Sequence, residues 1–228
     1  MSPRRIAPHK KQGGLPSWVI PVGIGVLVVV GVLALAALQT PSAPVPTSSG
    51  LTASGRTIGN LNSKVAVVEF ADFQCPICRE FAITAEPQIE TQYVQTNKIS
   101  FTYKYFPVVD QGGVSESHWA AEAAECANQQ DKFWEYRAKL AAVWTGERVG
   151  NFTKANLKKY AADLGLDATK FNPCVDNDQT ASIVQTDEAQ AQSLGLPGTP
   201  SFLINGKFFR NNTIGFDEFA RTFDSLLK

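Results

Sequence analysis

Hydrophobic residues follow two different patterns along the chain. Residues 18–38 form a nearly unbroken apolar stretch, and no charged residue occurs between Lys11 and Arg56. As a helix, residues 19–38 would be about 30 Å long, which matches the hydrocarbon core of a bilayer. Beyond residue 56, short apolar runs and alternating apolar and polar positions are typical of strands and helices in a folded domain. The pattern therefore predicts one membrane-spanning helix at 18–38, ahead of a folded domain.

The apolar stretch can also be interpreted as a signal peptide that is cleaved. The small residues at 34–37 would suit a cleavage site, but the apolar core of a signal peptide is only about 7 to 15 residues long. We therefore expect an uncleaved anchor, with residues 1–17, which include four basic residues, in the cytoplasm. Residues 39–56 are rich in Pro, Ser, Thr and Gly and are predicted to form a flexible linker. The domain at 57–228 is then expected outside the cytoplasm, on a single-pass protein of the cell membrane.

The folded domain has the order of elements of a small α/β fold. Strands are predicted at 65–70, 98–106, 201–204 and 207–209, the last two joined by a two-residue turn. Helices are predicted at 78–94, 114–129, 132–144, 154–164, 176–193 and 216–227. A strand–helix–strand unit followed by an antiparallel hairpin predicts a mixed sheet with helices on its faces, interrupted by a long helical insertion.

Two cysteines stand where the first strand passes into the first helix, in the sequence Cys75-Pro76-Ile77-Cys78. The first amides of a helix are unpaired and carry a partial positive charge, so they stabilise a thiolate at Cys75. Pro76 suits the first helical turn, where its missing N–H would have no partner. Cys78 lies one turn further, close enough to attack a mixed disulfide at Cys75. This spacing predicts a redox pair that exchanges disulfides.

The other two cysteines, Cys126 and Cys174, are far apart in the sequence. Four cysteines outside the cytoplasm permit three pairings, and a redox pair at Cys75 and Cys78 leaves Cys126 with Cys174 as a structural disulfide. One alternative is a relay that passes electrons from one pair to the other, and another is a zinc site. The second pair lacks the CxxC spacing and no His is suitably placed, so we expect no metal and no cofactor.

Glu69 is the one charged residue in the first strand, six positions before Cys75. Burying a carboxylate is costly unless it is paired or protonated, so burial would raise the pKa of Glu69. The alternative is a strand at the edge of the sheet, with Glu69 facing water.

Composition and charge narrow the class of protein. The chain has 228 residues, 44% of them hydrophobic, which is enough for one well-filled domain with an appendage. Four of the 21 basic residues precede the apolar stretch, so 17 basic residues stand against 21 acidic residues in the rest of the chain. A mildly acidic domain without a basic stripe gives no reason to expect nucleic acid as a partner.

Four short motifs of the folded domain are similar to those of one family. They are Phe73-Gln74-Cys75-Pro76-Ile77-Cys78, Tyr105-Phe106-Pro107, Ala123-Ala124-Glu125-Cys126-Ala127 with Lys132-Phe133-Trp134-Glu135, and Gly198-Thr199-Pro200-Ser201-Phe202. In this order they resemble the DsbA-like thiol:disulfide oxidoreductases of the thioredoxin superfamily, from about residue 58 to the end of the chain. The resemblance implies a thioredoxin-like fold with a helical insertion at about 112–195.

The resemblance also implies roles for individual residues. In the superfamily the proline that matches Pro200 is cis and faces the reactive cysteine, and the residue before it, here Thr199, offers backbone hydrogen bonds to the substrate. An ordinary trans turn is the alternative. An acid in the place of Glu69 helps to move protons during thiol exchange. A second disulfide similar to Cys126–Cys174 occurs in some members.

We therefore expect an enzyme that donates disulfides to reduced secreted proteins through Cys75 and Cys78. The family's partners imply reoxidation by a membrane quinone-linked enzyme of the DsbB or VKOR-like type. Ile77 stands where DsbA has a His and cannot place charge or a donor near the Cys75 sulfur, so we expect a weaker oxidant than DsbA. Two alternatives are a membrane-tethered reductase or isomerase of the same fold and a non-catalytic, chaperone-like module that binds unfolded chains.

Overall fold

A computed structural model describes residues 53–110, 113, 115–210 and 214–228. The predicted cytoplasmic segment at 1–17, the predicted membrane helix at 18–38 and most of the predicted linker lie outside the described residues. In the part of the chain that is described, no helix combines the length and the apolar character needed to cross a bilayer.

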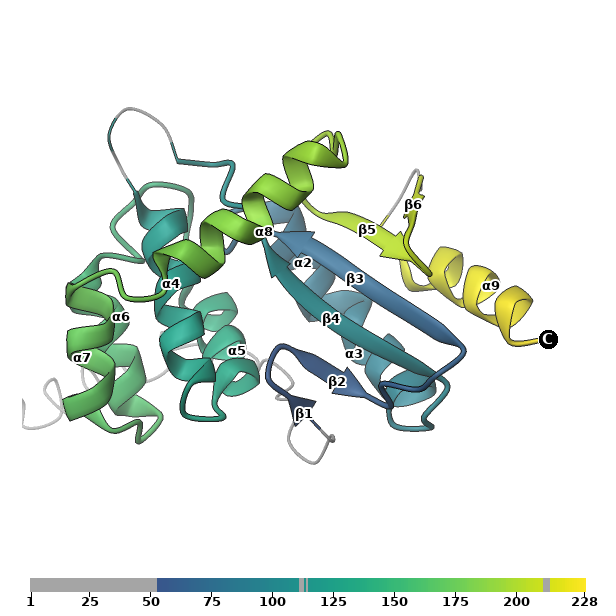
Figure 1. Ribbon diagram of the computed structural model, residues 1–228, viewed down its shortest axis with the longest axis horizontal. Coiled ribbons are helices and arrows are strands. Elements are labelled where there is room, and N and C mark those ends of the chain that lie inside the picture. The colour runs from purple at the N-terminus through teal and green to yellow at the C-terminus, as the bar shows by residue number, and fades with distance from the viewer. Residues whose placement is uncertain (1–52, 111–112, 114, 211–213) are drawn as a thin grey trace, which may run out of the picture. The chain divides into compact units, whose positions relative to one another are not determined.

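Within the described residues, six strands form one mixed sheet, drawn as arrows in Figure 1. The strands are β1 (Ala53–Ser54), β2 (Thr57–Gly59), β3 (Val65–Ala71), β4 (Ile99–Tyr105), β5 (Ser201–Ile204) and β6 (Lys207–Phe209). Their order across the sheet is β1-β2-β4-β3-β5-β6. The central strands β3 and β4 are parallel, and all other neighbours are antiparallel. The carboxyl ends of β3 and β4 therefore lie side by side at the same end of the sheet, and the CxxC motif begins there.

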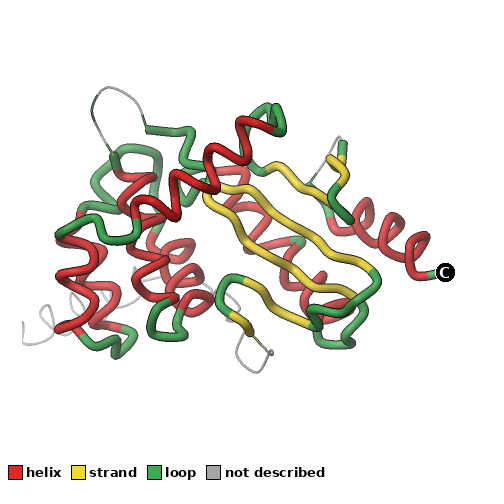
Figure 2. Tube along the Cα trace, viewed as in Figure 1, coloured by secondary structure: helices red, strands yellow, loops and turns green. Residues whose placement is uncertain are grey.

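Helices cover both faces of the sheet, as Figures 1 and 2 show. The helical elements of the described residues are α2 (Pro76–Thr84), α3 (Glu86–Ile89), the π-helical turn η1 (Glu90–Val94), α4 (Glu116–Asn128), α5 (Phe133–Val143), α6 (Lys154–Asp163), α7 (Ala168–Asp176), α8 (Ala181–Ser193) and α9 (Phe216–Leu227). In Figure 1, α2 and α3 pass behind the sheet and α8 crosses in front of it. Helices α4 to α8 make up the helical insertion, and α4 to α7 gather at one end of the sheet.

Side chains of β3 alternate between the two faces of the sheet. Val65, Val67 and Glu69 are fully buried on the face of the larger core. Phe70 points to the other face, where it packs with Ala191 of α8 in a smaller cluster. Successive residues of a strand point to opposite faces, so Glu69 must share the face of the two valines. The alternation therefore places a carboxyl group inside the main core.

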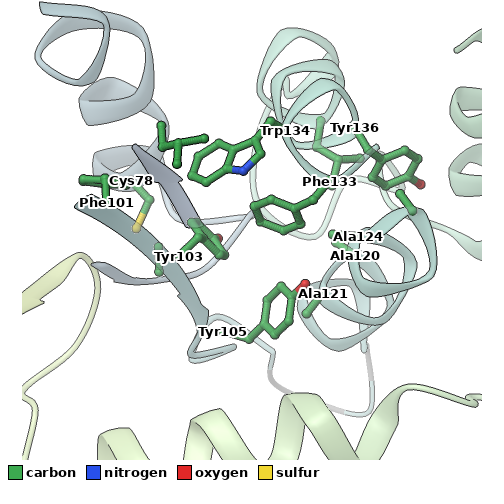
Figure 3. Packing of buried hydrophobic residues seen from close by; sticks show 14 of the residues in the cluster. Cys78, Phe101, Tyr103, Tyr105, Ala120, Ala121, Ala124, Phe133, Trp134 and Tyr136 are labelled. Atoms are coloured by element: carbon green, nitrogen blue, oxygen red, sulfur yellow. The ribbon is translucent and has the colours of Figure 1, made fainter. Parts of the chain in front are cut away.

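The helical insertion shares this core with the sheet. Figure 3 shows Phe133 and Trp134 of α5 pointing toward the tyrosines of β4. The Phe133 ring lies 5.5 Å from the ring of Tyr103 and 6.3 Å from that of Tyr105. Trp134 meets Phe133 edge-on at 5.1 Å. Such aromatic pairs add to the free energy gained by burial alone, so the insertion is held to the sheet by core packing.

The α/β class, the strand–helix–strand unit and the helical insertion are confirmed, but several local predictions are wrong. Ala53–Ser54, which the composition assigns to the linker, forms β1 and pairs with β2, itself not predicted. This edge is exposed and short, so it has no hydrophobic pattern to reveal it. The single helix expected at 78–94 is three segments, with Pro87 in the first turn of α3.

The helix expected at 176–193 is confirmed from Ala181 to Ser193, but its predicted start is five residues too early. The chain leaves α7 at Asp176 and α8 begins only at Ala181. Between them, Asp178 has a φ of 50°, in the left-handed region that ends a right-handed helix. Helix α7 itself was not predicted, since it is short and has Pro173 inside it.

A disulfide joins Cys126 of α4 to Cys174 of α7 across the insertion. Both residues are buried. The bond closes a loop with a sequence separation of 48 residues, which restricts the unfolded chain far more than the folded one. The bond therefore ties α4, the first helix of the insertion, to α7.

Replacing Cys126 and Cys174 by Ala is expected to lower the free energy of unfolding by about 4 kcal/mol, the loop-entropy value for this separation. Chemical denaturation measures the difference. A background in which Cys75 and Cys78 are also Ala keeps the redox pair out of the comparison. A loss below about 1 kcal/mol would contradict a structural role for this disulfide.

Candidate active site

Cys75 lies between the end of β3 and the beginning of α2. It is the N-cap residue of α2, and its sulfur accepts a hydrogen bond from the backbone N–H of Cys78, at an N···S distance of 3.5 Å. Pro76 occupies the first helical position, as the sequence predicts. The unpaired amides at the start of α2 therefore point at the Cys75 sulfur.

The two cysteines of the pair have opposite electrostatic environments. The pKa of Cys75 is lowered to about 6, first by the hydrogen bond with the Cys78 thiol and then by Thr199 and the backbone amides of α2, against the effect of burial. Burial raises the pKa of Cys78 well above its ordinary value. At neutral pH Cys75 is therefore mainly a thiolate and Cys78 a thiol.

The segment Thr199-Pro200 lies beside this sulfur. Its peptide bond is cis, and the backbone carbonyl oxygen of Thr199 is 3.4 Å from the sulfur of Cys75. Antiparallel pairing of Ser201 with Phe70 holds the segment against the end of β3. The backbone of Thr199 is therefore next to the Cys75 sulfur, and its role in substrate binding stays a prediction.

Open space adjoins the cis proline. A groove of about 520 Å³ is lined by residues 197–201 and 208–210. The apolar side chains of Ile77, Val108 and Val149 are exposed at the surface. Val108 donates its backbone N–H to Asp72 and residue 148 donates to Gln74, so both segments adjoin the residues just before Cys75.

Among the described residues, no group of three or more His, Cys, Asp or Glu is arranged to hold a metal ion.

Glu69 is fully buried on the central strand β3. The alternative of an exposed edge position is therefore wrong. Burial raises the pKa of Glu69 to about 8, with Arg137 opposing the rise and Glu86 adding to it. A cavity of about 20 Å³ is lined by both Glu69 and Cys78, and this volume has room for about one water molecule. Glu69 and Cys78 therefore border the same cavity, and the role of Glu69 in proton transfer stays a prediction.

The sequence interpretation missed the two charged partners of Glu69. Arg137 of α5 has its Nη2 atom 3.2 Å from Glu69 Oε2, and Glu86 of α3 binds the same guanidinium. Arg137 stands four positions after Phe133, so helical spacing places it on the buried face of α5. That spacing was the one available signal, since nothing in the sequence marks Glu86.

Two further missed residues, Asp72 and Gln74, hold the junction between β3 and α2 in place. The Asp72 carboxylate accepts hydrogen bonds from the backbone N–H groups of Gln74, Val108 and Val109 and from the Ser117 hydroxyl. The buried Gln74 amide donates to Ser117 and accepts from the backbone N–H of residue 148. The junction is thus bonded to the segment after β4, to α4 and to the loop after α5.

Comparisons with known proteins agree with this geometry. Residues 52–225 match the family model described as Thioredoxin. The probable disulfide bond formation protein D of Bacillus anthracis is 29% identical over 181 residues, covering 76% of this chain and 78% of that protein. The crystal structure of oxidised BdbD from Bacillus subtilis superposes with a TM-score of 0.68 at 24% identity, covering 79% of this chain and 98% of that one.

A different kind of relative shares only part of its length with this chain. The Na(+)/H(+) antiporter NhaA 3 of Salinispora tropica is 32% identical over 149 residues. The match covers 65% of this chain but spans only 21% of the antiporter. The similar segment is therefore one part of a much longer protein there.

Replacing Cys78 by Ala is expected to raise the pKa of Cys75 by about one pH unit, because the thiol that makes its largest stabilising contact is lost. Cys78→Ser is the matched control, since it keeps a hydroxyl donor at the same position. The rate of alkylation of Cys75 against pH gives the pKa of each reduced protein, with an inflection near pH 6 for the wild type. Equal inflections in the Ala and Ser variants would show that the contact is unimportant.

Proposed function

This chain belongs to the thioredoxin family, and from that premise we propose that its Cys75–Cys78 pair donates disulfides to reduced proteins outside the cytoplasm. The chain is a protein disulfide oxidoreductase of the DsbA-like kind. The direction of electron flow, the compartment and the partners are the parts that we propose.

One observation carries the direction of the reaction, namely the stabilised thiolate of Cys75. Its pKa of about 6 compares with about 8.5 for an ordinary thiol. A thiolate that the folded protein stabilises favours the reduced form of the pair, so the disulfide form is readily reduced by a substrate. This stabilisation is complete above the ordinary pKa and is lost as the pH falls through about 6, so we expect the pair to be a weaker oxidant in acid.

The proposed reaction transfers two electrons from the substrate to the enzyme. A substrate thiolate attacks the Cys75 sulfur, the Cys75–Cys78 bond breaks, and Cys78 leaves and takes up a proton. A second substrate thiolate then attacks the substrate sulfur of the mixed disulfide and releases Cys75 as a thiolate. The low pKa of Cys75 makes it a good leaving group in this second step.

The surface around Cys75 supports an unfolded protein as the substrate. Exposed apolar side chains such as Ile77 and Val149 can contact the apolar residues of an unfolded chain. The backbone of Thr199, beside the sulfur, can pair with an extended peptide. For reoxidation we propose a membrane quinone-linked enzyme of the DsbB or VKOR-like type, in line with the family resemblance.

Membrane attachment is proposed from the apolar stretch at 18–38. The buried Cys126–Cys174 disulfide supports an oxidising compartment for the folded domain.

A reductase or isomerase of the same fold is the second candidate, because the pKa of Cys75 is lowered only moderately. A value of about 6 is closer to the value of about 7 in thioredoxin than to the value of about 3.5 in DsbA. The equilibrium of the pair with glutathione separates the two directions, since a pair that stays oxidised in excess thiol belongs to a reductase.

The oxidised full-length protein is expected to speed disulfide formation in a reduced, unfolded ribonuclease at least tenfold over buffer, by the fast attack on Cys75. Recovery of ribonuclease activity measures the rate. Cys75→Ser should abolish the effect, and Cys126→Ala with Cys174→Ala should leave it largely intact. No acceleration by the wild-type protein would refute disulfide donation.

Cys75 is expected to react with a membrane-impermeant thiol reagent in intact cells after mild reduction, because residues 18–38 place the domain outside. The protein should also sediment with membranes. A variant with two Arg residues in place of Val29 and Val30 should lose the membrane association, because charges inside the apolar stretch are costly. Labelling only after cell lysis would refute the proposed topology.

A further inference from the structure

Three charged side chains from three elements meet in the main core. Glu69 of β3, Glu86 of α3 and Arg137 of α5 have exposed fractions of 0%, 3% and 8%. Arg137 donates two short hydrogen bonds to Glu86, from Nη1 to Oε1 at 2.7 Å and from Nη2 to Oε2 at 2.5 Å. Its bond to Glu69, from Nη2 to Oε2, is longer at 3.2 Å. The arginine is therefore engaged mainly by Glu86.

The charges of this triad do not balance. Two ionised carboxylates against one guanidinium would leave a net negative charge in the core, which is costly. Glu86 makes the bidentate pair that favours its ionised form. Glu69 has a single longer bond, and its Oε1 atom has no hydrogen-bond partner. The geometry therefore favours Glu69 as the carboxyl that holds a proton.

We propose that Glu86 is a positioning residue for proton transfer in this enzyme: by engaging both terminal nitrogens of Arg137, it leaves Glu69 as the carboxyl that exchanges a proton with Cys78. The inference deepens the proposed function and rests on the predicted role of Glu69. Glu69 and Cys78 line the same small cavity, and Glu86 is not among the residues that line it. Glu86 thus acts through Arg137 and does not touch the reacting sulfur.

The proton step is the same in both directions of exchange. When a substrate thiolate attacks Cys75, the electron pair of the broken S–S bond goes to Cys78, and the proton of Glu69 passes to that sulfur. In reverse, the Cys78 thiol returns its proton to the Glu69 carboxylate, and its thiolate attacks Cys75 and expels the bound thiolate. Glu69 must therefore change its protonation near neutral pH, which a full ion pair with Arg137 would prevent.

The charged and titratable groups that face Glu69 come from every element packed around it. They are Arg137 of α5, Glu86 of α3, Cys75, Cys78 and Arg79 of the α2 region, Tyr103 of β4 and Asp72 after β3. Burial raises the pKa values of Tyr103 and Cys78 well above their ordinary values, so both stay neutral near pH 7. Of the remaining groups, Glu86 can be neutralised without touching the redox pair or the cavity.

Glu86→Gln removes one charge and keeps a similar shape. The proton affinity of Glu69 should fall, because a negative charge is lost and Arg137 becomes free to bind Glu69 fully. Mixing the reduced full-length protein with a disulfide of glutathione and thionitrobenzoate loads glutathione onto Cys75 in a fast phase. The slower release of glutathione reports the attack by Cys78. We expect the midpoint of its pH profile to move down by about one pH unit in Glu86→Gln.

Matched variants separate positioning from general damage to the fold. Glu122→Gln neutralises another buried glutamate, in α4, whose neighbours are Asp178, Lys154 and His118, and it should keep the wild-type midpoint. Glu69→Gln should remove the pH-dependent limb, and Glu86→Gln added to it should change nothing further. Glu86→Asp withdraws the carboxylate by one methylene and should give a smaller downward shift, which provides the test where the Gln variant does not fold.

The outcomes distinguish this inference from its premises. A wild-type midpoint in both Glu86 variants, together with a limb lost in Glu69→Gln, overturns the role of Glu86 alone. An unchanged profile in Glu69→Gln overturns the roles of both residues. An effect of Glu86→Gln that persists without Glu69 also overturns positioning. The release of glutathione does not depend on the direction of electron flow in the cell, so failure of the ribonuclease assay would leave this test valid.

Discussion

The position of one sulfur atom at the amino end of α2 is the constraint on which the rest of the site depends. Cys75 caps the helix, and a displacement by a single residue would take its sulfur away from the free amides. The hydrogen bonds of Asp72 and Gln74 prevent such a displacement, because they tie the junction to three other segments. The buried polar residues just before the CxxC motif thus serve the chemistry of the thiol by fixing the backbone.

The helical insertion contributes side chains to the buried surroundings of Glu69. Helix α5 packs Phe133 against the tyrosines of β4 and, one turn later, brings Arg137 to Glu69. The guanidinium lies 5.0 Å from the centre of the Tyr103 ring, so aromatic packing and charge meet at the same place. A lysine could not replace it, since only a planar fork can hold Glu86 with two bonds and still reach Glu69.

The sequence predicts those parts of the site whose residues all lie within one short segment of the chain. Residues 65–78 alone predict the CxxC pair and its position at a strand end, and they favour a buried Glu69 with a raised pKa over an exposed one at the sheet edge. Arg137 and Glu86 were not found, because their meeting depends on how α3 and α5 pack on the sheet, and an isolated charge in a helix most often faces water. Strand β1 was missed because both of its residues are exposed and it is held by backbone pairing with β2, so its sequence shows no hydrophobic pattern.

The difference in acidity between the two cysteines explains why a third titratable group is needed. A thiolate attacks a disulfide fastest when the sulfur that leaves has a low pKa. Cys75 meets this condition, whereas the buried Cys78 does not. In the proposed reaction, the attack of a substrate thiolate on Cys75 expels Cys78, so this step is slow unless a proton reaches the Cys78 sulfur as the bond breaks. Burial keeps Cys78 protonated and prevents it from competing as a nucleophile, but it also means that Cys78 leaves readily only if an acid protonates it. The buried Glu69 has a pKa near neutrality. In our proposal it keeps that pKa because Glu86 engages Arg137.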